Sequence, residues 1–335
     1  MPLNVNETEH AIKLIKDTFE TLLSSSLHLR RVTAPLFVKS NQGLNDTLND
    51  NADPIKFKVP ALNNEECEIV QSLAKWKRLK LAEMKEQPGF GIYTDMNAIR
   101  PNETLDFLHS LYVDQWDWEK VLTPNQFNNG NITGMSYAIQ IYSAIKNTDY
   151  VLREHYKDLG KSFLPDQIQP IMSDRLATKY PDLSPAEREY EYCKKHKAVY
   201  IMGIGGKNHD GMRAPDYDDW DKNGDILIWS PILNRPIEIS SMGIRVNAES
   251  LHKQLEASGH LDWEKYEYHK KILNNELPQT IGGGIGQSRL CMLLLQKKHI
   301  GEVQVSVWPD IEIKKYQYQN EMATIMHTTN YVNLL

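Results

Sequence analysis

The sequence predicts a mixed α+β fold, because β-like runs occur in both halves of the chain without regular alternation with helices. Regular alternation would instead indicate a parallel sheet of the Rossmann type. The chain has 335 residues, which is long enough to bury most of the surface that its unfolded state exposes. Its apolar fraction of 41% and charged fraction of 24% are those of an ordinary globular protein.

Charge and cysteine content exclude several classes of protein. A net charge of −6 argues against a protein that binds nucleic acid mainly by neutralising phosphates. The three cysteines form no C-x-x-C pair, so neither a zinc ribbon nor a dithiol redox site is expected, and the count favours a reducing compartment. The longest apolar run, residues 290–295, is too short to span a membrane, and the N-terminus lacks signal-peptide features. We therefore expect a cytoplasmic protein.

The first third of the chain predicts two helices and a loop. Residues 7–24 repeat apolar side chains at helical spacing, which predicts an amphipathic helix. Pro35 predicts an extended edge or a turn after this helix. Residues 40–55 are rich in Asn, Asp and Gly and predict a loop, and residues 66–84 predict the second helix.

Two β-like runs follow, at residues 90–100 and 108–119. Alternation in the second run places Gln115 and Asp117 on one face, and the tryptophans of the run on the other. A solvated face of an antiparallel sheet explains these two polar residues without any function.

The rest of the chain mixes both kinds of element. We expect helices at residues 133–157, 184–197, 249–258 and 262–275, and strands at 198–204, 225–229, 237–246 and 303–308. Residues 282–286 predict a glycine-rich turn that opens a helix at 287–298.

Two glycine-rich segments are candidate phosphate sites. Residues 203–207 (GIGGK) fail the G-x-x-x-x-G-K-[ST] pattern and favour a strand-to-loop turn. Gly284 and Gly286 precede a predicted helix whose N-terminus would offer backbone N–H groups and a positive dipole end, with Arg289 in its first turn. Spacing alone leaves a polyphosphate site and an ordinary tight turn equally open.

Two carboxylates occupy neighbouring predicted strands. Asp225 opens one strand and Glu238 interrupts the next. Burying both is costly unless a cation or a partner compensates, and Mg²⁺ bound together with substrate phosphates would do so. An ordinary surface ion pair explains them equally well. Arg100, at the end of a predicted strand, is by itself more often solvated than a ligand.

The order of these segments resembles the catalytic core of class II aminoacyl-tRNA synthetases. Motif 1 corresponds to residues about 7–40, motif 2 to about 90–120 and motif 3 to about 278–298. Within that group the chain is similar to the ammonia-dependent asparagine synthetases, the aspartate–ammonia ligases. The strings RAPDYDDW at 213–220 and PQTIGGGIGQSR at 278–289 carry much of this similarity.

The resemblance implies one catalytic domain over residues 1–335, with no anticodon-binding domain. It implies a mostly antiparallel central sheet flanked by helices, and a homodimer joined through the motif 1 region near Pro35. It also implies that aspartate and ATP·Mg²⁺ form a β-aspartyl adenylate, which ammonia converts to asparagine and AMP. Neither a membrane nor a nucleic acid is an expected partner. The tail after Trp308 departs from the family pattern and has no assigned role.

Site residues are carried over from the family position by position. The resemblance implies that Arg100 stabilises the reacting α-phosphate and that Arg289 holds the γ-phosphate end. It also implies that Asp225 and Glu238 are metal-binding acids that contact ATP, as Gly284 and Gly286 are expected to do. The aspartate-binding positions are Asp46, Ser72, Ala74 (through its backbone), Lys77, Gln115, Asp117 and Ser241.

Charge suggests roles for some of these residues. Lys77 is expected to pair with the carboxylate that is not activated, and Asp46 with the α-ammonium. Asp218 or Asp46 is expected to accept the proton that ammonium must lose before or during attack. A solvated acidic loop at 216–219 is the competing interpretation.

Three other functions are alternatives to ammonia-dependent asparagine synthesis. Glutamine-dependent synthesis needs a cysteine exposed by Met removal, whereas residue 2 is Pro and Cys67 lies in a predicted helix, so free ammonia is the expected nitrogen source. An aspartyl- or asparaginyl-tRNA synthetase needs an anticodon-reading domain and a basic face for tRNA. A non-catalytic paralogue that senses amino acid or nucleotide would have little use for the complete set Arg100, Asp225, Glu238 and Arg289.

Overall fold

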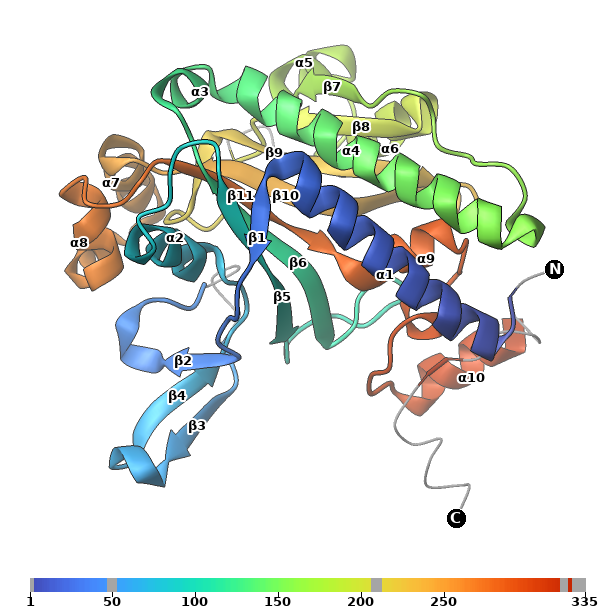
Figure 1. Cartoon of the computed structure of the whole chain (residues 1–335), viewed down its shortest axis with the longest axis horizontal. Coiled ribbons are helices and arrows are strands. Elements are labelled where there is room, and N and C mark those ends of the chain that lie inside the picture. The colour runs from blue at the N-terminus through green and yellow to red at the C-terminus, as the bar shows by residue number, and fades with distance from the viewer. Residues whose placement is uncertain (1–2, 47–52, 206–212, 320–324, 327–335) are drawn as a thin grey trace.

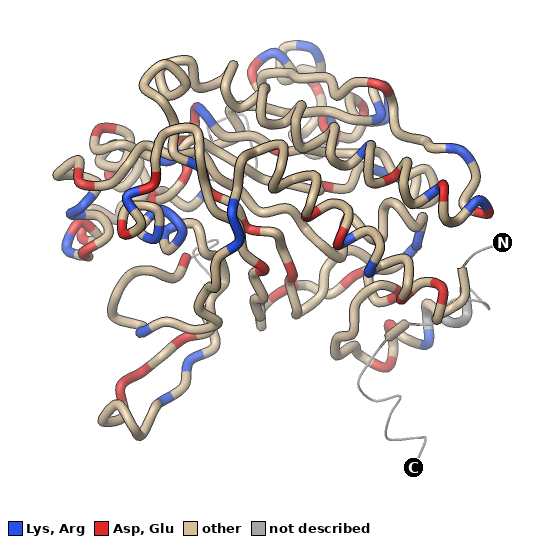
Figure 2. Tube along the Cα trace, in the orientation of Figure 1, with Lys and Arg blue, Asp and Glu red and all other residues tan. Residues whose placement is uncertain are grey.

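The computed structural model describes residues 3–46, 53–205, 213–319 and 325–326 (Figure 1). Its α-helices are α1 (Val5–Leu27), α2 (Ala74–Glu83), α3 (Pro124–Asn128), α4 (Gly130–His155), α5 (Ser173–Lys179), α6 (Pro185–His196), α7 (Ala248–Ser258), α8 (Glu267–Leu273), α9 (Gln287–Leu294) and α10 (Asp310–Gln319). No helix of the described chain is both long and apolar enough to cross a membrane. Figure 2 shows acidic and basic residues interspersed along the described trace.

An eight-stranded sheet with the order β1-β5-β6-β11-β10-β9-β8-β7 forms the centre of the molecule. Its strands are β1 (Leu29–Arg31), β5 (Gly91–Ile99), β6 (Tyr112–Val121), β11 (Thr280–Gly286), β10 (Arg235–Arg245), β9 (Asp218–Ser230), β8 (Ala198–Met202) and β7 (Gln169–Met172). The edge pairs β1–β5 and β7–β8 are parallel, and the pairs between them are antiparallel. The expected mostly antiparallel α+β fold is therefore confirmed.

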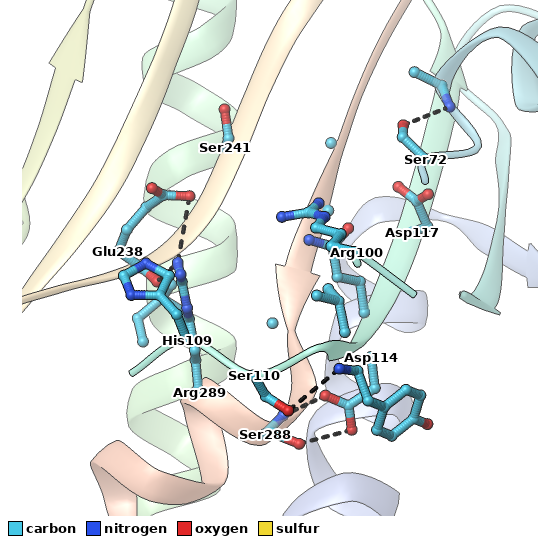
Figure 3. Close-up of a pocket in the computed structure, with 18 of the residues that line it drawn as sticks. Ser72, Arg100, His109, Ser110, Asp114, Asp117, Glu238, Ser241, Ser288 and Arg289 are labelled. Carbon is cyan, nitrogen blue, oxygen red and sulfur yellow. Dashed lines mark hydrogen bonds and ion pairs between the residues drawn. The ribbon is translucent and has the colours of Figure 1, made fainter. Parts of the chain in front are cut away.

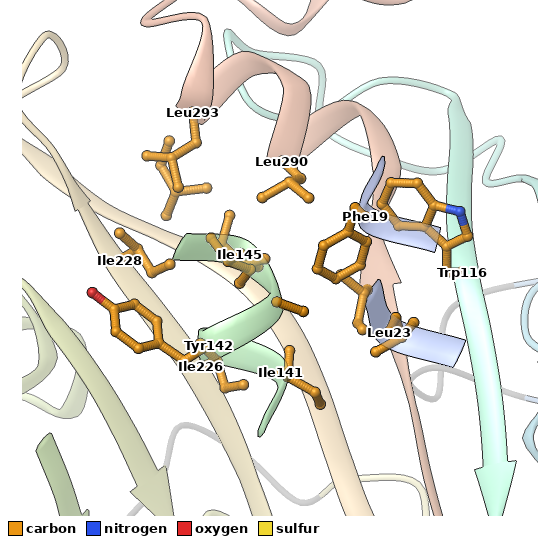
Figure 4. Close-up of a cluster of buried hydrophobic side chains, with 14 of the residues drawn as sticks. Phe19, Leu23, Trp116, Ile141, Tyr142, Ile145, Ile226, Ile228, Leu290 and Leu293 are labelled. Atoms are coloured by element: carbon orange, nitrogen blue, oxygen red, sulfur yellow. The ribbon is translucent and has the colours of Figure 1, made fainter. Parts of the chain in front are cut away.

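Helices α1 and α4 pack side by side over one face of this sheet (Figure 1). Along α1, apolar side chains recur every four residues, so they form one buried stripe that includes Ile15, Phe19 and Leu23. The ring of Phe19 lies 4.7 Å, between centroids, from that of Trp116 on β6 (Figure 4). Trp116 therefore points into the core, as the alternation of this strand predicts, and its polar neighbours point to the other face.

Helix α2 covers part of the other face of the sheet, and the part beside α2 is open. Side chains of α2 reach β6, because Lys77 contacts Asp117 and Glu119 there. A separate apolar cluster joins α7 and α8, through residues that include Leu251 and Ile272. The polar face of the central strands thus lies beside α2 and the cluster of α7 and α8, and it is accessible to a ligand.

A small three-stranded sheet, with the order β2-β4-β3, projects from the main body (Figure 1). It contains β2 (Phe37–Lys39), β4 (Glu65–Ile69) and β3 (Lys56–Val59). The prediction of one helix over residues 66–84 is wrong in its first part, because β4 pairs with strands on both sides and only the second part is α2. Cys67 consequently lies on a strand. Part of the predicted loop at 40–55 lies outside the described residues, and its first turn is the 3₁₀ helix η1 (Ser40–Gln42).

Three further expectations need correction. The predicted turn at 282–286 is part of strand β11, which pairs with β10 and β6. The predicted strand at 303–308 does not form; a 3₁₀ helix, η5 (Ile300–Glu302), precedes irregular chain there. Residues 262–275 form two shorter elements, η4 (Leu261–Lys265) and α8. In each case pairing or packing with distant segments overrides the local pattern.

Candidate active site

A polar cavity of about 360 Å³ opens over the strands at the middle of the sheet. Of the residues predicted for the site, those that line the cavity are Ser72, Ala74, Lys77, Arg100, Gln115, Asp117, Asp218, Glu238, Ser241, Gly284, Gly286 and Arg289. Asp46 and Asp225 do not line it. The cavity therefore brings together side chains that lie more than 200 residues apart in the sequence, including both predicted arginines (Figure 3).

The cavity floor depends on the glycines of β11. Gly284 pairs with Asp117 on one side and with Ser241 on the other. A Cβ atom on Gly284 would lie 2.2 Å from Oε1 of Gln115, so any side chain here would displace that amide. Because alternate residues of β11 are glycines without side chains, the polar side chains of β6 and β10 can lie over this strand.

Lys77 enters the cavity wall from α2 and holds Asp117. Its ammonium donates to Oδ1 of Asp117, to the carbonyl of Trp118 at 3.0 Å and to that of Gly283 at 3.4 Å. Oδ2 of Asp117 is buried and has no hydrogen-bond partner in the described part of the chain. The three protons of Lys77 are thus already donated, while one carboxylate oxygen of Asp117 is left for a ligand.

A second cation, Arg245, is buried between two acids. Its Nη2 lies 2.7 Å from Oε2 of Glu119, and its Nη1 contacts Asp218. Burial raises the pKa of Glu119, but Arg245 and the other donors outweigh it and hold that pKa below its ordinary value. Burial raises the pKa of Asp218, which Arg245 only partly offsets. Both acids therefore depend on Arg245 to remain ionised.

Arg289 stands across the cavity from Asp117, beside Glu238, and Arg100 lies between Arg289 and Asp117 (Figure 3). Burial lowers the pKa of Arg100, and the nearby charge of Arg289 adds to this effect. Nη1 of Arg289 donates to the carbonyl of Glu238 at 3.2 Å and lies 3.7 Å from its carboxylate. Two guanidinium groups on one cavity form a site for a polyanion.

Arg213 is a cavity residue that the predicted set lacks. Its Nη2 lies 2.5 Å from Oδ2 of Asp225, and its Nη1 donates to Oγ of Ser241 at 2.9 Å. The only sequence signal was its position at the start of the string at 213–220. It screens Asp225 from the cavity, which explains why that acid is not among the lining residues.

Asp225 and Glu238 are close enough to affect each other's charge. Burial raises the pKa of Asp225 to about 6, and the charge of Glu238 adds to the increase while Arg213 opposes it. Oδ1 of Asp225 is buried without a hydrogen-bond partner in the described chain. Within the described ranges no group of three or more His, Cys, Asp or Glu side chains could hold a metal ion. The two carboxylates therefore fit Mg²⁺ only with further oxygen ligands from a substrate.

Asp46 lies in a buried network behind the cavity rather than in its wall. Its Oδ1 is 3.7 Å from the ammonium of Lys75, which is 2.5 Å from Oδ2 of Asp216. His269 contacts the same oxygen of Asp216 at 3.0 Å. Burial raises the pKa of Asp46 to about 6. Asp216, Asp218 and Asp219 are all buried, so the interpretation of 216–219 as a solvated acidic loop is wrong.

The glycine-rich segment at residues 203–207 is separate from this site. Gly203 follows the end of β8 with a φ of +68°, as a strand-to-loop turn requires. Gly206 and Lys207 lie outside the described residues.

Replacing Arg245 with Met should destabilise the protein strongly. The change leaves Glu119 and Asp218 buried without their cation, which typically costs about 3–5 kcal/mol of folding free energy. Urea unfolding measures this loss. The matched control, Lys253→Met, breaks an exposed ion pair with Glu249 and should leave stability nearly unchanged. Equal stability of both variants would contradict the importance assigned to the buried cluster.

Comparisons with known proteins agree with this geometry. The sequence profile of the aspartate–ammonia ligase family matches residues 6–320. The aspartate–ammonia ligase of Parabacteroides distasonis is 50% identical over 328 residues, with 93% of each chain covered. That of Bacillus cereus strain G9842 is 51% identical over 314 residues, covering 92% of this chain and 94% of the relative.

Solved structures of asparaginyl-tRNA synthetases share the fold. The enzyme of Entamoeba histolytica, in complex with asparaginyl-adenylate, matches with a TM-score of 0.64 at 15% identity, over 90% of this chain and 66% of that one. That of Pyrococcus horikoshii matches with a TM-score of 0.61 at 13% identity, over 88% and 67%. These likenesses confirm the class II synthetase core. The profile match and the relatives at about half identity show that the chain belongs to the aspartate–ammonia ligase family.

Proposed function

We propose that the chain makes L-asparagine from L-aspartate and ammonia in two steps at this cavity, with ATP as co-substrate. Membership of the aspartate–ammonia ligase family supports the overall reaction. The observation that carries the mechanism is that Arg100 and Arg289 share one cavity with the Lys77–Asp117 pair. One end of the cavity is suited to a polyphosphate, and the other to a small zwitterion.

In the first step a β-carboxylate oxygen of aspartate attacks the α-phosphorus of ATP. A new P–O bond forms, the bond between the α-phosphorus and the α,β-bridging oxygen breaks, and pyrophosphate leaves. Arg100 stabilises charge on the α-phosphate oxygens, and Arg289 holds the departing end. The choice of the β- over the α-carboxyl follows the family resemblance.

Asp117 is assigned to the α-ammonium of the substrate aspartate. Its Oδ2 has no hydrogen-bond partner among the described residues, whereas Asp46 lies outside the cavity wall and is paired with Lys75. Lys77 contributes by orienting Asp117 and by its positive charge beside the substrate carboxylate. Ser72, Gln115 and Ser241 supply polar contacts from three sides.

Mg²⁺ would be held by Asp225, Glu238 and phosphate oxygens, where it would neutralise charge on the triphosphate. For Asp225 the oxygen that could bind the ion would be Oδ1, which has no hydrogen-bond partner in the described chain, while Oδ2 pairs with Arg213. Arg213 thereby orients this carboxylate as well as screening it.

In the second step the nitrogen of ammonia attacks the acyl carbon of the adenylate. The C–N bond forms, the C–O bond to AMP breaks, and one nitrogen proton must be accepted. Asp218 is assigned as the acceptor because it lines the cavity and its pKa is raised by burial. Asp46, the other acid considered for this role, lies farther back in its network with Lys75.

Two expectations stay predictions. One is a single catalytic domain over residues 1–335. The other is a homodimer formed through the motif 1 region near Pro35. Exposed apolar side chains at Leu36, Phe37 and Phe57 beside this region support the second.

A single assay separates this function from its rivals. Incubation of the protein with ATP, Mg²⁺, L-aspartate and ammonium chloride should yield asparagine and AMP in equal amounts without tRNA. AMP formed only with tRNA would indicate a tRNA synthetase. Tight binding of aspartate or AMP without turnover would indicate a sensor.

Asp218→Asn should separate the two half-reactions. Aspartate-dependent exchange of pyrophosphate into ATP should persist, while asparagine formation should fall by about 10²–10⁴-fold because the proton acceptor is lost. The matched control is Asp219→Asn, which alters a neighbouring acid outside the cavity that pairs with Lys222. If exchange and amide formation fall together in the Asp218 variant, the assignment is wrong.

Binding of ATP should depend on the charge of Asp225. Because its pKa is raised from 3.8 to about 6, the acid takes up a proton as the pH falls through 6 and loses its attraction for Mg²⁺. The KM for ATP should therefore rise by up to about tenfold per pH unit below 6 and be flat above 7. Phosphates of ATP titrate in the same range, so the comparison is with Asp225→Asn. An identical pH profile in that variant would refute the assignment.

A further inference from the structure

The N-terminus of α9, which carries Arg289, is capped from a neighbouring strand. Its own N-cap residue, Gly286, has no side chain, and no acid lies in its first turn. Instead the backbone N–H of Ser288 donates to Oδ1 of Asp114 at 3.0 Å, and the hydroxyl of Ser288 donates to Oδ2 at 2.8 Å (Figure 3). Free N–H groups and the positive end of the dipole favour a carboxylate at this place. Asp114 of β6 thus serves as the cap that α9 lacks.

Asp114 also joins α9 to two other segments. Nζ of Lys16 on α1 lies 3.2 Å from its Oδ2. The amide of Gln304 donates to Oδ1 of Asp114 at 3.3 Å and to Oγ of Ser288 at 3.0 Å. Asp114, Ser288 and Gln304 are buried, so losing one partner leaves polar atoms that water cannot readily satisfy. The arrangement holds the first turn of α9 in one position.

This arrangement bears on the polyphosphate site that the sequence leaves open at the N-terminus of this helix. The backbone N–H of Ser288 donates to Asp114 and is not available to a phosphate. The side chain of Arg289, which lines the cavity, depends for its direction on how α9 is held.

We propose that Asp114 is a positioning residue that orients Arg289 toward the triphosphate by capping α9. The inference rests on the proposed function, which assigns Arg289 to the triphosphate. Arg289 directly follows Ser288, so a shift of the capped turn moves its Cα. Among the described residues, the guanidinium of Arg289 makes polar contacts with Glu238 only. The backbone position of Arg289 is therefore set by the capped first turn of α9.

Electrostatics and positioning predict opposite effects of removing Asp114. As a negative charge in the cavity wall, Asp114 repels ATP, so its removal by charge alone would tighten binding. As a cap it holds Arg289 in place, so its removal would weaken binding. Asn and Ala at this position remove the same charge, but only Asn keeps an oxygen acceptor for the N–H of Ser288.

The experiment measures the dissociation constants of ATP and AMP by calorimetry for a set of variants. Asp114→Ala should weaken ATP binding about tenfold, the loss expected for a missing helix cap. Asp114→Asn should restore most of this affinity, and Ser288→Ala should give an intermediate loss. AMP lacks the β- and γ-phosphates, so its affinity should change less than about twofold in every variant. A twofold change corresponds to about 0.4 kcal/mol of binding free energy, which is within the usual scatter between independent variants. The control, Lys253→Met, breaks an exposed ion pair with Glu249 on α7 and should leave ATP affinity unchanged.

A double-mutant cycle with Arg289→Ala completes the test. If Asp114 acts through Arg289, Asp114→Ala should cause no further loss of ATP affinity in that background. Equal losses with and without Arg289, tighter ATP binding in both Asp114 variants, or a parallel loss of AMP would overturn the inference while leaving the proposed function intact. If Arg289→Ala by itself leaves ATP affinity unchanged, the assigned role of Arg289 and the inference fall together. Ser288→Ala keeps the test decisive should Asp114→Ala not fold.

Discussion

Alternating buried charge on one face of the central sheet is the constraint on which the site depends. Asp117, Lys77, Glu119, Arg245 and Asp218 form a series in which each cation lies between two acids. Buried ions are tolerated only when partners surround them, so removing a cation that two acids share is costly. The acids outnumber the cations, and Oδ2 of Asp117 has no hydrogen-bond partner in the described chain. The same arrangement that permits burial therefore creates a binding site.

The buried series of charged side chains requires that the strand beside it, β11, be rich in glycine. A side chain on Gly282 would lie 2.0 Å from Oε2 of Glu119, and one on Gly284 would collide with Gln115. The glycines of β11 thus leave room for the polar chains of the neighbouring strands. Past its end, the same segment begins α9, whose first turn Asp114 anchors. One stretch of twelve residues, 278–289, consequently shapes the cavity beside Gln115 and carries Arg289 into its wall.

Prediction succeeded where local pattern and tertiary environment agree. The spacing of apolar residues in α1 and the alternation along β6 placed Phe19 and Trp116 in the core, and both are buried there. It failed at β4, because a strand between two others is stabilised by a ladder that its own sequence does not show. It also failed at 282–286. Glycines are typical of turns, but here they form a strand on which side chains would collide with the neighbouring strands.

The sequence by itself determined the fold class and the family, and most of the site residues that it predicted line the cavity, because these predictions rest on periodicity and on motifs read along the chain. Only the tertiary structure decided which side chains are partners. It placed Asp46 with Lys75 behind the wall, brought Arg213 to Asp225, and directed the ammonium of Lys77 to Asp117 and to two backbone carbonyls. The physical reason is that the charge and pKa of a buried group depend on neighbours within a few ångströms, which come from distant parts of the chain.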